Sequence, residues 1–468
     1  GTRAPSSARL GAAVWRPPSR RLTAGLALIL TLLVVGRYAA VTAPALYGRP
    51  INLFWDARHL PRVAAMLIEA APLPLILAGA LGLLTLVTVV HGLLRWSLGQ
   101  IGAAVARPRQ RGILMLLSGV LCGVYLTGLV SQRVDWEHRF SLPVTGTYAE
   151  QAAFALHALG AAAHTLPPSP PMRSDLDRIR GAHLVILFAE SYGAVTYEDP
   201  MVAAALDGGR RELAEALART GRRAVSALVR SPTFGGNSWL AHASLLSGVE
   251  VSDGDAYQLL LTQSRETLVH RFARAGYRTL AVMPGLRQAW PEGAFYGFDA
   301  ILGAQALGYR GPDLGWWRIP DQFALARLDA DELGSGDGRA RFAVFPTINS
   351  HIPFRPTPPY QPDWGRVLTA EPFEAVDVAA ALAQRPGLAE MRDAYADSLS
   401  YLFRVLAGWL GDKPDLDLVL LVLGDHQPPA IVSGEGAPWE VPVHLITGRA
   451  GVTDALATRG FGPGLVPP

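Results

Sequence analysis

Two apolar runs of this sequence end in side chains that could carry chemistry. Residues 418–423 consist only of leucine and valine and lead into Gly424, Asp425 and His426. Residues 183–189 are similarly apolar and lead into Glu190. Runs of this length are typical of buried strands, and carboxylates and imidazoles are ligands for divalent cations. We therefore expect one metal site, built from distant parts of the chain and serving catalysis.

A glycine-rich turn supplies a possible nucleophile. Gly235, Gly236 and Asn237 precede Ser238, and a helical pattern follows. A serine there would lie at a helix N-terminus, whose free amides favour an anion such as phosphate. The simpler alternative is that Ser238 only caps the helix.

A histidine follows a third apolar run. His351 comes just after residues 342–348 and shortly before Pro353. Its imidazole could hydrogen-bond a phosphoryl oxygen or a leaving group. The alternative is an ordinary loop histidine that faces solvent.

Short apolar runs alternate with helical patterns throughout the second half of the chain. This alternation predicts a largely parallel sheet covered by helices on both faces, with the ligand site at the carboxyl ends of its strands. The expected strands are residues 183–189, 223–228, 278–282, 342–348, 417–423 and 441–446, and the expected helices include 210–220, 240–246, 265–274 and 391–410.

The first part of the chain has the composition of a membrane domain. The mean hydropathy is +0.22, and residues 22–36, 70–94 and 112–132 contain no Asp, Glu, Lys or Arg. A helix needs about 20 apolar residues to span a bilayer. The second and third segments meet this length, and the first does so if it continues through Arg37.

Arginine placement predicts the orientation of these spans. Basic residues without acidic ones precede the first span and lie between the second and third, so both segments are expected in the cytoplasm. They are Arg3, Arg9, Arg16, Arg20 and Arg21, then Arg95, Arg107, Arg109 and Arg111. Three crossings place everything after Gln132 outside. A cleaved signal peptide, ending near Ala43-Pro44-Ala45, is the alternative for the first segment.

These patterns predict three regions. Residues 1–132 form a membrane domain with about three transmembrane helices, 133–180 a connector with a proline-rich linker, and 181–468 an extracytoplasmic catalytic domain. The pI near 9.1 owes much to the cytoplasmic arginines, so we expect contact with lipid headgroups and not with nucleic acid. Cys122 is the single cysteine, which excludes an intrachain disulfide and cysteine-based metal sites.

The four motifs, taken in order, resemble the alkaline phosphatase/sulfatase superfamily. The resemblance covers residues 183–446 and is strongest to the membrane branch that contains lipoteichoic acid synthases and lipid A phosphoethanolamine transferases. It implies an alkaline phosphatase-like α/β domain behind N-terminal transmembrane helices. It also implies one divalent metal ion (Mn, Zn or Mg) held by Glu190, Ser238, Asp425 and His426, with Ser238 as nucleophile. His351, Trp317 and Arg318 would contact the substrate.

Two departures from the family pattern bear on the activity. The membrane branch typically uses threonine as nucleophile, and Ser238 keeps the hydroxyl. Sulfatases place Pro two residues and Arg four residues after a Cys or Ser that becomes formylglycine, whereas this chain has Leu240 and His242. Hydrolysis of sulfate esters is therefore not expected.

The resemblance implies a phosphotransferase of the bacterial cytoplasmic (inner) membrane. It would be a multi-pass protein with a periplasmic or otherwise extracytoplasmic catalytic domain. It would move phosphoglycerol or phosphoethanolamine from a phospholipid donor to a glycan or lipid acceptor through a phosphoserine. Two alternatives stay open: a phosphodiesterase or phosphatase with the same residues, and a non-catalytic membrane sensor.

Overall fold

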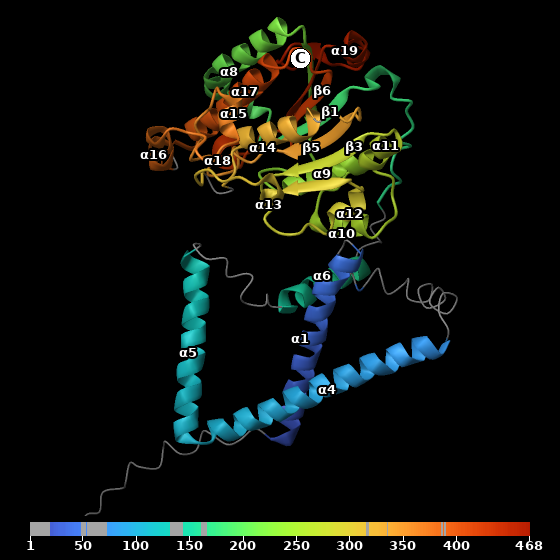
Figure 1. The fold of residues 1–468 in the computed structure, drawn as a ribbon, viewed down its shortest axis with the longest axis vertical. Helices are drawn as coiled ribbons and strands as arrows, with labels where there is room; N and C mark the ends of the chain where they lie inside the picture. Colours follow the sequence, from blue (N-terminus) through green and yellow to red (C-terminus); the bar gives the residue numbers. More distant parts are fainter. Residues whose placement is uncertain are drawn as a thin grey trace, which may run out of the picture. The chain divides into compact units, whose positions relative to one another are not determined.

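The chain forms two compact units, which divide between Ala163 and His164. The structure, a computed structural model, describes residues 19–47, 53, 73–131, 144–160, 166–314, 318–334, 336–384, 387 and 390–468. Figure 1 shows the helical first unit and the α/β second unit.

Within the described residues of the first unit, three helices are long and apolar enough to cross a membrane. They are α1 (Arg20–Tyr47), α4 (Leu73–Val105) and α5 (Pro108–Ser131). Their leucines and valines are mostly exposed, as expected for helices that face lipid. A shorter helix, α6 (Val144–Gly160), packs on α1, and Tyr148 Oη donates a 2.8 Å hydrogen bond to the carbonyl oxygen of Leu32.

The second unit is built on an eight-stranded sheet with the order β4-β3-β5-β1-β6-β7-β2-β8. Its members are β1 (His183–Ala189), β2 (Arg223–Arg230), β3 (Arg278–Met283), β4 (Ala300–Gly303), β5 (Arg341–Pro346), β6 (Leu418–Gly424), β7 (Glu440–Thr447) and β8 (Gly462–Pro463). Strands β1, β3, β4, β5 and β6 are parallel. β7 pairs antiparallel with β6 and with β2, so β2 again runs with the parallel set.

Alternate side chains of β1 enter different cores. Val185 and Leu187 pack in one cluster, and Ile186 and Phe188 pack in the other. A strand that is buried on both faces needs apolar residues at every position. The first cluster is covered by α8 (Pro200–Arg219), α14 (Asp321–Leu328) and α17 (Met391–Gly411), and the second by α9 (Ser238–Ser247), α10 (Gly254–Leu261) and α11 (Leu268–Arg274).

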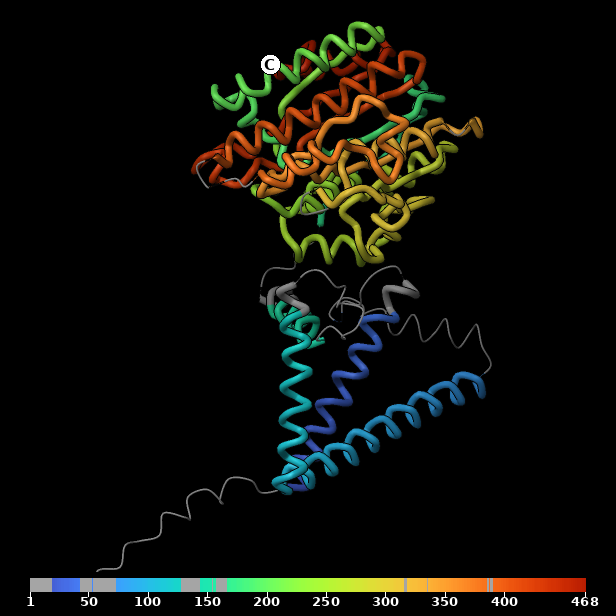
Figure 2. Tube along the Cα trace, turned by 60° about the vertical axis from the view of Figure 1, so that its left-hand side comes forward, coloured from blue at the N-terminus to red at the C-terminus, as the bar shows by residue number. Residues whose placement is uncertain are grey.

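Helices α8 and α17 run side by side, as Figures 1 and 2 show. Gly209 of α8 allows the close approach, since a Cβ atom there would lie 3.2 Å from Cβ of Phe403.

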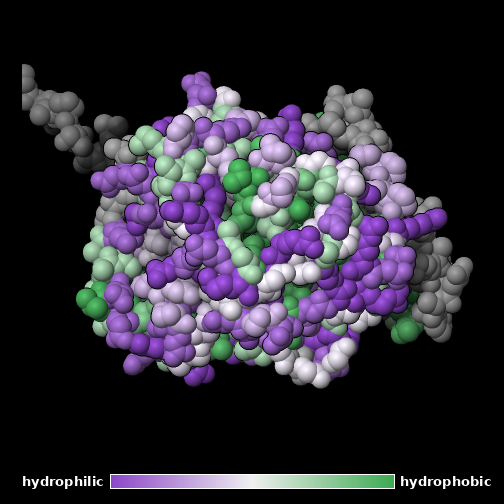
Figure 3. All heavy atoms as spheres, turned by 90° about the horizontal axis from the view of Figure 1, so that it is seen from above, coloured by the Kyte–Doolittle hydropathy of each residue, from purple (hydrophilic) through white to green (hydrophobic). Residues whose placement is uncertain are grey.

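Figure 3, which views the molecule from above, shows a mainly hydrophilic surface with hydrophobic residues gathered in a hollow.

The predicted fold class is confirmed: apolar N-terminal helices precede a mostly parallel sheet sandwiched by helices. Several details differ from the sequence prediction, of which three matter most. The helix expected at residues 210–220 begins at Pro200, where Asp199 caps it. The four-residue strand β4 was not predicted, because its pattern is too short. β7 is antiparallel to its neighbours.

The proline-rich segment, residues 166–171, is packed into the second unit. The Arg265 guanidinium donates hydrogen bonds to the carbonyl oxygens of Leu166 and Pro167 and to Oγ of Ser169. Pro170 packs over Gly248, where a Cβ atom would lie 2.7 Å from its ring. The start of this unit is therefore fixed before β1 begins.

Candidate active site

The turn after β1 positions Glu190 at the carboxyl end of the strand. Its backbone N–H donates to Oγ1 of Thr347 at 3.0 Å, and its carbonyl oxygen accepts from Oγ of Ser350 at 2.7 Å. Ser191 follows with φ 58°, a left-handed conformation that is uncommon for a residue with a side chain. The tight turn holds the buried Glu190 carboxylate at the carboxyl end of β1.

A second tight turn delivers Ser238. Gly235, Gly236 and Asn237 all have positive φ, and α9 begins at Ser238 itself. The Ser238 hydroxyl donates a 2.9 Å hydrogen bond to Oε2 of Glu190 and lies 3.2 Å from Nε2 of His426. The first backbone amides of a helix lack partners within the helix, so Ser238 lies where an anion would be stabilised.

The end of β6 supplies the other two groups. Oδ1 of Asp425 accepts hydrogen bonds from the backbone N–H groups of Ser191 (2.8 Å) and His426 (2.7 Å). Nδ1 of His426 donates to the carbonyl oxygen of Gln427 at 2.8 Å. This bond turns Nε2 toward Oε1 of Glu190, 3.4 Å away, and Oδ1 of Asp425, 3.8 Å away.

Burial and mutual attraction set the charges of this cluster. Burial alone would raise the pKa of Glu190, but the hydrogen bond and positive charge of His426 outweigh it and lower that pKa. Burial and repulsion from Glu190 raise the pKa of Asp425. Burial would lower the pKa of His426, but attraction to the two carboxylates raises it. The two buried carboxylates, Glu190 and Asp425, thus favour a positively charged group beside them.

The same residues fit a divalent cation. Ligand atoms from Glu190, Asp425 and His426 lie within 4.8 Å of one another, and all three side chains are buried. Among the described residues, Oδ2 of Asp425 is a fully enclosed oxygen without a hydrogen-bond partner. A buried carboxylate oxygen is costly unless it is hydrogen-bonded, protonated or bound to a cation, and this one accepts no hydrogen bond. The hydrogen bond from His426 to a backbone carbonyl also matches the way in which metal-ligating histidines are oriented.

The remaining predicted residues lie farther from this cluster or outside the described chain. His351 is near enough to Glu190 for its charge to help lower the pKa of that carboxyl, and its Nδ1 donates to the carbonyl oxygen of Ile352 at 2.7 Å. The Arg318 guanidinium pairs with Asp313 at 2.7 Å and is exposed. Trp317 lies outside the described residues.

Several residues that support the site were not predicted. Oη of Tyr395 donates to the carbonyl oxygen of Ser191 at 2.8 Å, and Thr347 anchors Glu190 as described above. The carboxylate of Asp321 accepts from the backbone N–H groups of Ile348 and Asn349 at 2.8 and 3.0 Å, and so holds the loop that carries His351. Their side chains come from segments without a distinctive sequence pattern.

Two further histidines are packed inside the unit. His242, one turn along α9 from Ser238, packs against Phe188 in a tilted arrangement with ring centroids 4.2 Å apart, and burial lowers its pKa to about 4. His444 hydrogen-bonds Oη of Tyr192 at 2.9 Å and Oγ of Ser226 at 2.6 Å, and burial lowers its pKa to about 3. Both imidazoles are therefore neutral at physiological pH.

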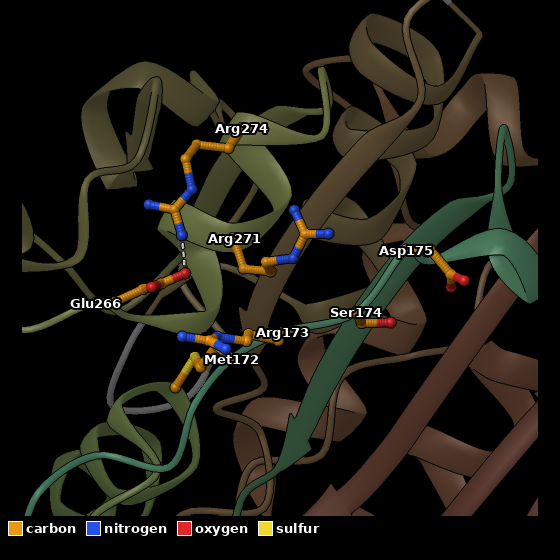
Figure 4. Close-up of a pocket in the computed structure, with 7 residues that line it drawn as sticks. All are labelled: Met172, Arg173, Ser174, Asp175, Glu266, Arg271 and Arg274. Carbon is orange, nitrogen blue, oxygen red and sulfur yellow. Dashed lines mark ion pairs between the residues drawn. The ribbon is translucent and has the colours of Figure 1, made fainter.

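A separate surface pocket lies near the amino ends of the parallel strands (Figure 4). It has a volume of about 590 Å³, and its lining residues are Met172, Arg173, Ser174, Asp175, Glu266, Arg271 and Arg274. The first four precede β1, and the arginines of α11 lead into the amino end of β3. This pocket is thus distinct from the cluster at the carboxyl ends.

Comparison with known families decides the classification. The family model described as Sulfatase matches residues 182–440, more than half of the chain. The chain belongs to the sulfatase family. The resemblance to the alkaline phosphatase/sulfatase superfamily is thereby confirmed, and the matched range contains Glu190, Ser238, Asp425 and His426. No curated protein matches the sequence.

This sulfatase-family chain is also similar to several solved structures. They include the lipoteichoic acid synthase LtaP from Listeria monocytogenes, with 13% identity and a TM-score of 0.40 over 58% of this chain and 68% of that one. The C-terminal periplasmic domain of EcEptC from Escherichia coli gives 15% and 0.39 over 63% and 79%. The Streptococcus pyogenes phosphoglycerol transferase GacH gives 13% and 0.38 over 57% and 68%.

Proposed function

We propose that this protein transfers a phosphoglycerol or phosphoethanolamine group from a phospholipid to an extracytoplasmic glycan or lipid. The observation that carries the proposal is the position of Ser238. Its hydroxyl lies at the N-terminus of α9, within hydrogen-bond distance of Glu190 and His426, in a chain whose three apolar helices can anchor it among phospholipids. Anchoring raises the effective concentration of a lipid substrate.

Glu190, Ser238, Asp425 and His426 are the residues that would hold one divalent metal ion. When bound, such an ion lowers the pKa of the serine hydroxyl and neutralises charge on a phosphate oxygen. The donors are three oxygens and one nitrogen, which suit Mn, Mg or Zn. The orphaned Oδ2 of Asp425 is the atom that supports this assignment best.

In the first step, Oγ of Ser238 forms a bond to phosphorus and the bond from phosphorus to the lipid glycerol oxygen breaks. The proton lost by the Ser238 hydroxyl ends on the departing diacylglycerol. The amides at the start of α9 and the imidazole of His351 stabilise the negative charge on the phosphoryl oxygens. Trp317 and Arg318 would line the headgroup side of the substrate pocket.

In the second step, a hydroxyl group of the acceptor attacks the phosphoserine. The bond between phosphorus and Oγ of Ser238 breaks, the acceptor loses its proton, and Ser238 regains one. Water in place of the acceptor would make the protein a phosphodiesterase. Transfer therefore requires that the acceptor hydroxyl attacks the phosphoserine before water does.

Headgroup-labelled phospholipid tests this proposal. The full chain in lipid nanodiscs is incubated with the labelled lipid and candidate acceptors, and the phosphoester products are identified by mass spectrometry. We expect diacylglycerol and a labelled adduct from the native chain and from Ser238→Thr, and neither from Ser238→Ala. Release of free headgroup phosphate without any adduct would contradict the transferase and favour the hydrolase. Equal turnover by Ser238→Ala would contradict the assigned nucleophile.

We also propose the location that this reaction requires. The protein would be a multi-pass protein of the bacterial cytoplasmic (inner) membrane, with residues 1–132 as membrane domain, 133–180 as connector and 181–468 as extracytoplasmic catalytic domain. The arginines before and at the start of α1, and those in and around the junction of α4 and α5, support this orientation. Protease digestion of intact spheroplasts should remove the catalytic domain and spare it in inverted vesicles; the opposite pattern would refute the orientation.

A further inference from the structure

Exposed large hydrophobic side chains of the second unit gather around one edge of its sheet. In the described part of this unit they are Met201, Val229, Trp239, Val376, Leu382, Ile431, Trp439 and Val466. All except Val466 lie on segments that begin or end near the carboxyl ends of the parallel strands. Single exposed hydrophobic residues are ordinary, whereas their collection at one edge marks an interaction surface.

Two exposed tryptophans among the described residues of this unit flank the candidate active site. Trp239 directly follows Ser238 and is 49% exposed, and Trp439 directly precedes β7 and is 41% exposed. Ile431, on α18 (Ala430–Ser433), is 43% exposed, five residues after His426. Val376, on α16 (Ala375–Ala383), is 73% exposed. We call Trp239, Val376, Ile431 and Trp439 the rim.

Hydrogen bonds tie the rim to the site through two loops. The backbone N–H of Ser231 donates to the carbonyl oxygen of Trp439 at 2.9 Å, and Oγ of Ser231 donates to the carbonyl oxygen of Asp425 at 2.5 Å. The N–H of Gly235, in the turn before Ser238, donates to the carbonyl oxygen of Gln427 at 3.0 Å. Ser231 therefore links the backbone of Trp439 to the backbone of Asp425, a candidate metal ligand.

Two further contacts join α16 and α18 to the same edge. Gln384, which ends α16, accepts hydrogen bonds from the Arg355 guanidinium at 3.0 Å and from the N–H of Thr357 at 3.1 Å, in the loop that follows His351. The Arg392 guanidinium, at the start of α17, donates to the carbonyl oxygen of Val432 in α18 at 3.2 Å. The rim is thus part of the framework that surrounds the site.

The chemistry of the rim suits a bilayer surface. The ring of Trp439 lies 5.8 Å from that of Phe234 and 5.6 Å below the guanidinium of Arg230. Tryptophan and arginine together favour the boundary between lipid headgroups and acyl chains. The acidic residues Asp377 and Glu435 lie on the same segments, so apolar contact and not net positive charge would drive the association.

We propose that the rim inserts into the headgroup layer of the bilayer in which the chain is anchored, so that the active-site edge rests on the lipid surface. The occupant follows from the chain itself, because its three membrane-spanning candidates keep a bilayer within reach of the unit. The inference deepens the proposed function, since it names the surface from which the site takes its phosphoester. It concerns binding, however, and can be tested without catalysis.

Site-specific labelling tests the docking. Cys122 is the only cysteine, so Cys122→Ser gives a cysteine-free full chain, into which Ile431→Cys or Val376→Cys introduces one environment-sensitive fluorophore. Ala218→Cys and Ala275→Cys are matched controls, because both exposed positions lie near the amino ends of strands. In nanodiscs that contain nitroxide-labelled phospholipid, we expect quenching at positions 431 and 376 and not at 218 and 275, with little loss in high salt.

The proposal would be overturned if the fluorophores at positions 431 and 376 were as fully exposed to water as those at 218 and 275. It would also be overturned if these labels left water only after a glycan polymer was added, since the rim would then be a glycan site. Failure of the proposed function looks different: the rim labels would be quenched by lipid nitroxides although no labelled headgroup is transferred.

A catalytic comparison adds a second measurement. We expect the triple variant Val376→Ser, Ile431→Ser and Trp439→Ser to turn over phospholipid in vesicles at least ~10-fold more slowly. Its turnover of a soluble diester, bis(4-nitrophenyl) phosphate, should match that of the native chain, because the side chains that contact phosphate are unchanged. Equal losses on both substrates, or no loss on either, would contradict the docking role.

Discussion

The backbone N–H of Ser191 donates a 2.8 Å hydrogen bond to Oδ1 of Asp425 and so joins the ends of two neighbouring strands. Ser191 adopts a left-handed conformation, with φ 58°, to direct its N–H at this oxygen. The bond occupies one carboxylate oxygen and leaves Oδ2 enclosed without a partner among the described residues. One oxygen of Asp425 therefore holds the fold together while the other is available to a cation.

The division between the two oxygens predicts the behaviour of Asp425→Asn. An amide can keep the acceptor at Oδ1 but places an NH₂ group where a cation would bind, so metal affinity should be lost while the fold persists. A metal at 100 times its Kd stabilises a native protein by about 2.7 kcal/mol. Thermal melting with Mn, Zn or Mg, and again with a chelator, should show a metal-dependent rise for the native chain and none for Asp425→Asn.

Asp207→Asn is the matched control, because Asp207 is exposed and pairs with Arg211 on the surface of α8. It should keep the full metal-dependent rise in melting temperature. A rise of the same size in Asp425→Asn would mean that the metal binds elsewhere.

Gly424 is the point of closest approach between β6 and the turn after β1. A Cβ atom there would lie 1.8 Å from the carbonyl oxygen of Tyr192 and 3.0 Å from Cβ of Val441. Gly424→Ala should therefore separate Glu190 from Asp425, lower the free energy of unfolding by about 2 kcal/mol or more, and abolish activity. Denaturant unfolding and turnover of a soluble diester measure the two effects.

Gly448 provides the control for this substitution, since a Cβ atom there would meet nothing closer than 3.9 Å. Gly448→Ala should change stability by less than about 0.5 kcal/mol and leave activity intact. A tolerated Gly424→Ala variant would contradict the close contact between the two strand ends.

His444 predicts loss of stability in acid. Burial depresses its pKa to about 3 in the folded chain, below the ordinary value near 6.5, so the unfolded chain binds the proton more readily. The stability that comes from keeping His444 neutral is fully present above about pH 6.5 and is lost as the pH falls toward 3. The free energy of unfolding should fall by roughly 2 kcal/mol by pH 5 for this reason. The melting temperature of His444→Gln should fall less between pH 7 and pH 5 than that of the native chain; parallel curves would refute the assignment.

Asp321 positions the loop of His351 and should affect substrate binding. Asp321→Ala would leave the buried N–H groups of Ile348 and Asn349 without acceptors, at a cost of about 1–3 kcal/mol each. Because His351 is proposed to contact the substrate phosphate, KM should rise more than kcat falls. Steady-state kinetics checks this ratio, with the exposed Asp331→Ala, which disturbs only a pair with Arg327, as control. A fall in kcat alone would contradict the positioning role.

The sequence allowed the sheet and the central cluster to be predicted for a physical reason. Strands buried on both faces are continuous apolar runs, as residues 183–189 and 418–423 are, and in parallel sheets the polar residues that follow them meet at one edge. Glu190, Asp425 and His426 were predicted in this way, whereas Ser238 was predicted from its glycine-rich turn and joined to the metal site by the family resemblance. The structure brings the four residues together.

Other features depend on contacts that leave no local pattern. Tyr395 reaches Ser191 from a helix whose hydrophobic spacing indicates only burial. The antiparallel direction of β7 depends on the short α18 connection after β6, which periodicity cannot distinguish from a crossover. The ion pair of Arg318 with Asp313 on the surface likewise follows from no sequence pattern.

The pairing of β1 with β6 also sets the order of events during synthesis. β1 is the first of the described strands to be made, yet one of its two neighbours in the sheet is β6, which begins only at Leu418. Contacts between residues so far apart form late and slowly, and until then β1 exposes an unpaired, strongly apolar edge. The nascent chain is therefore exposed to aggregation from the synthesis of β1 until that of β6, and a chain truncated before Leu418 would have neither the complete sheet nor the site.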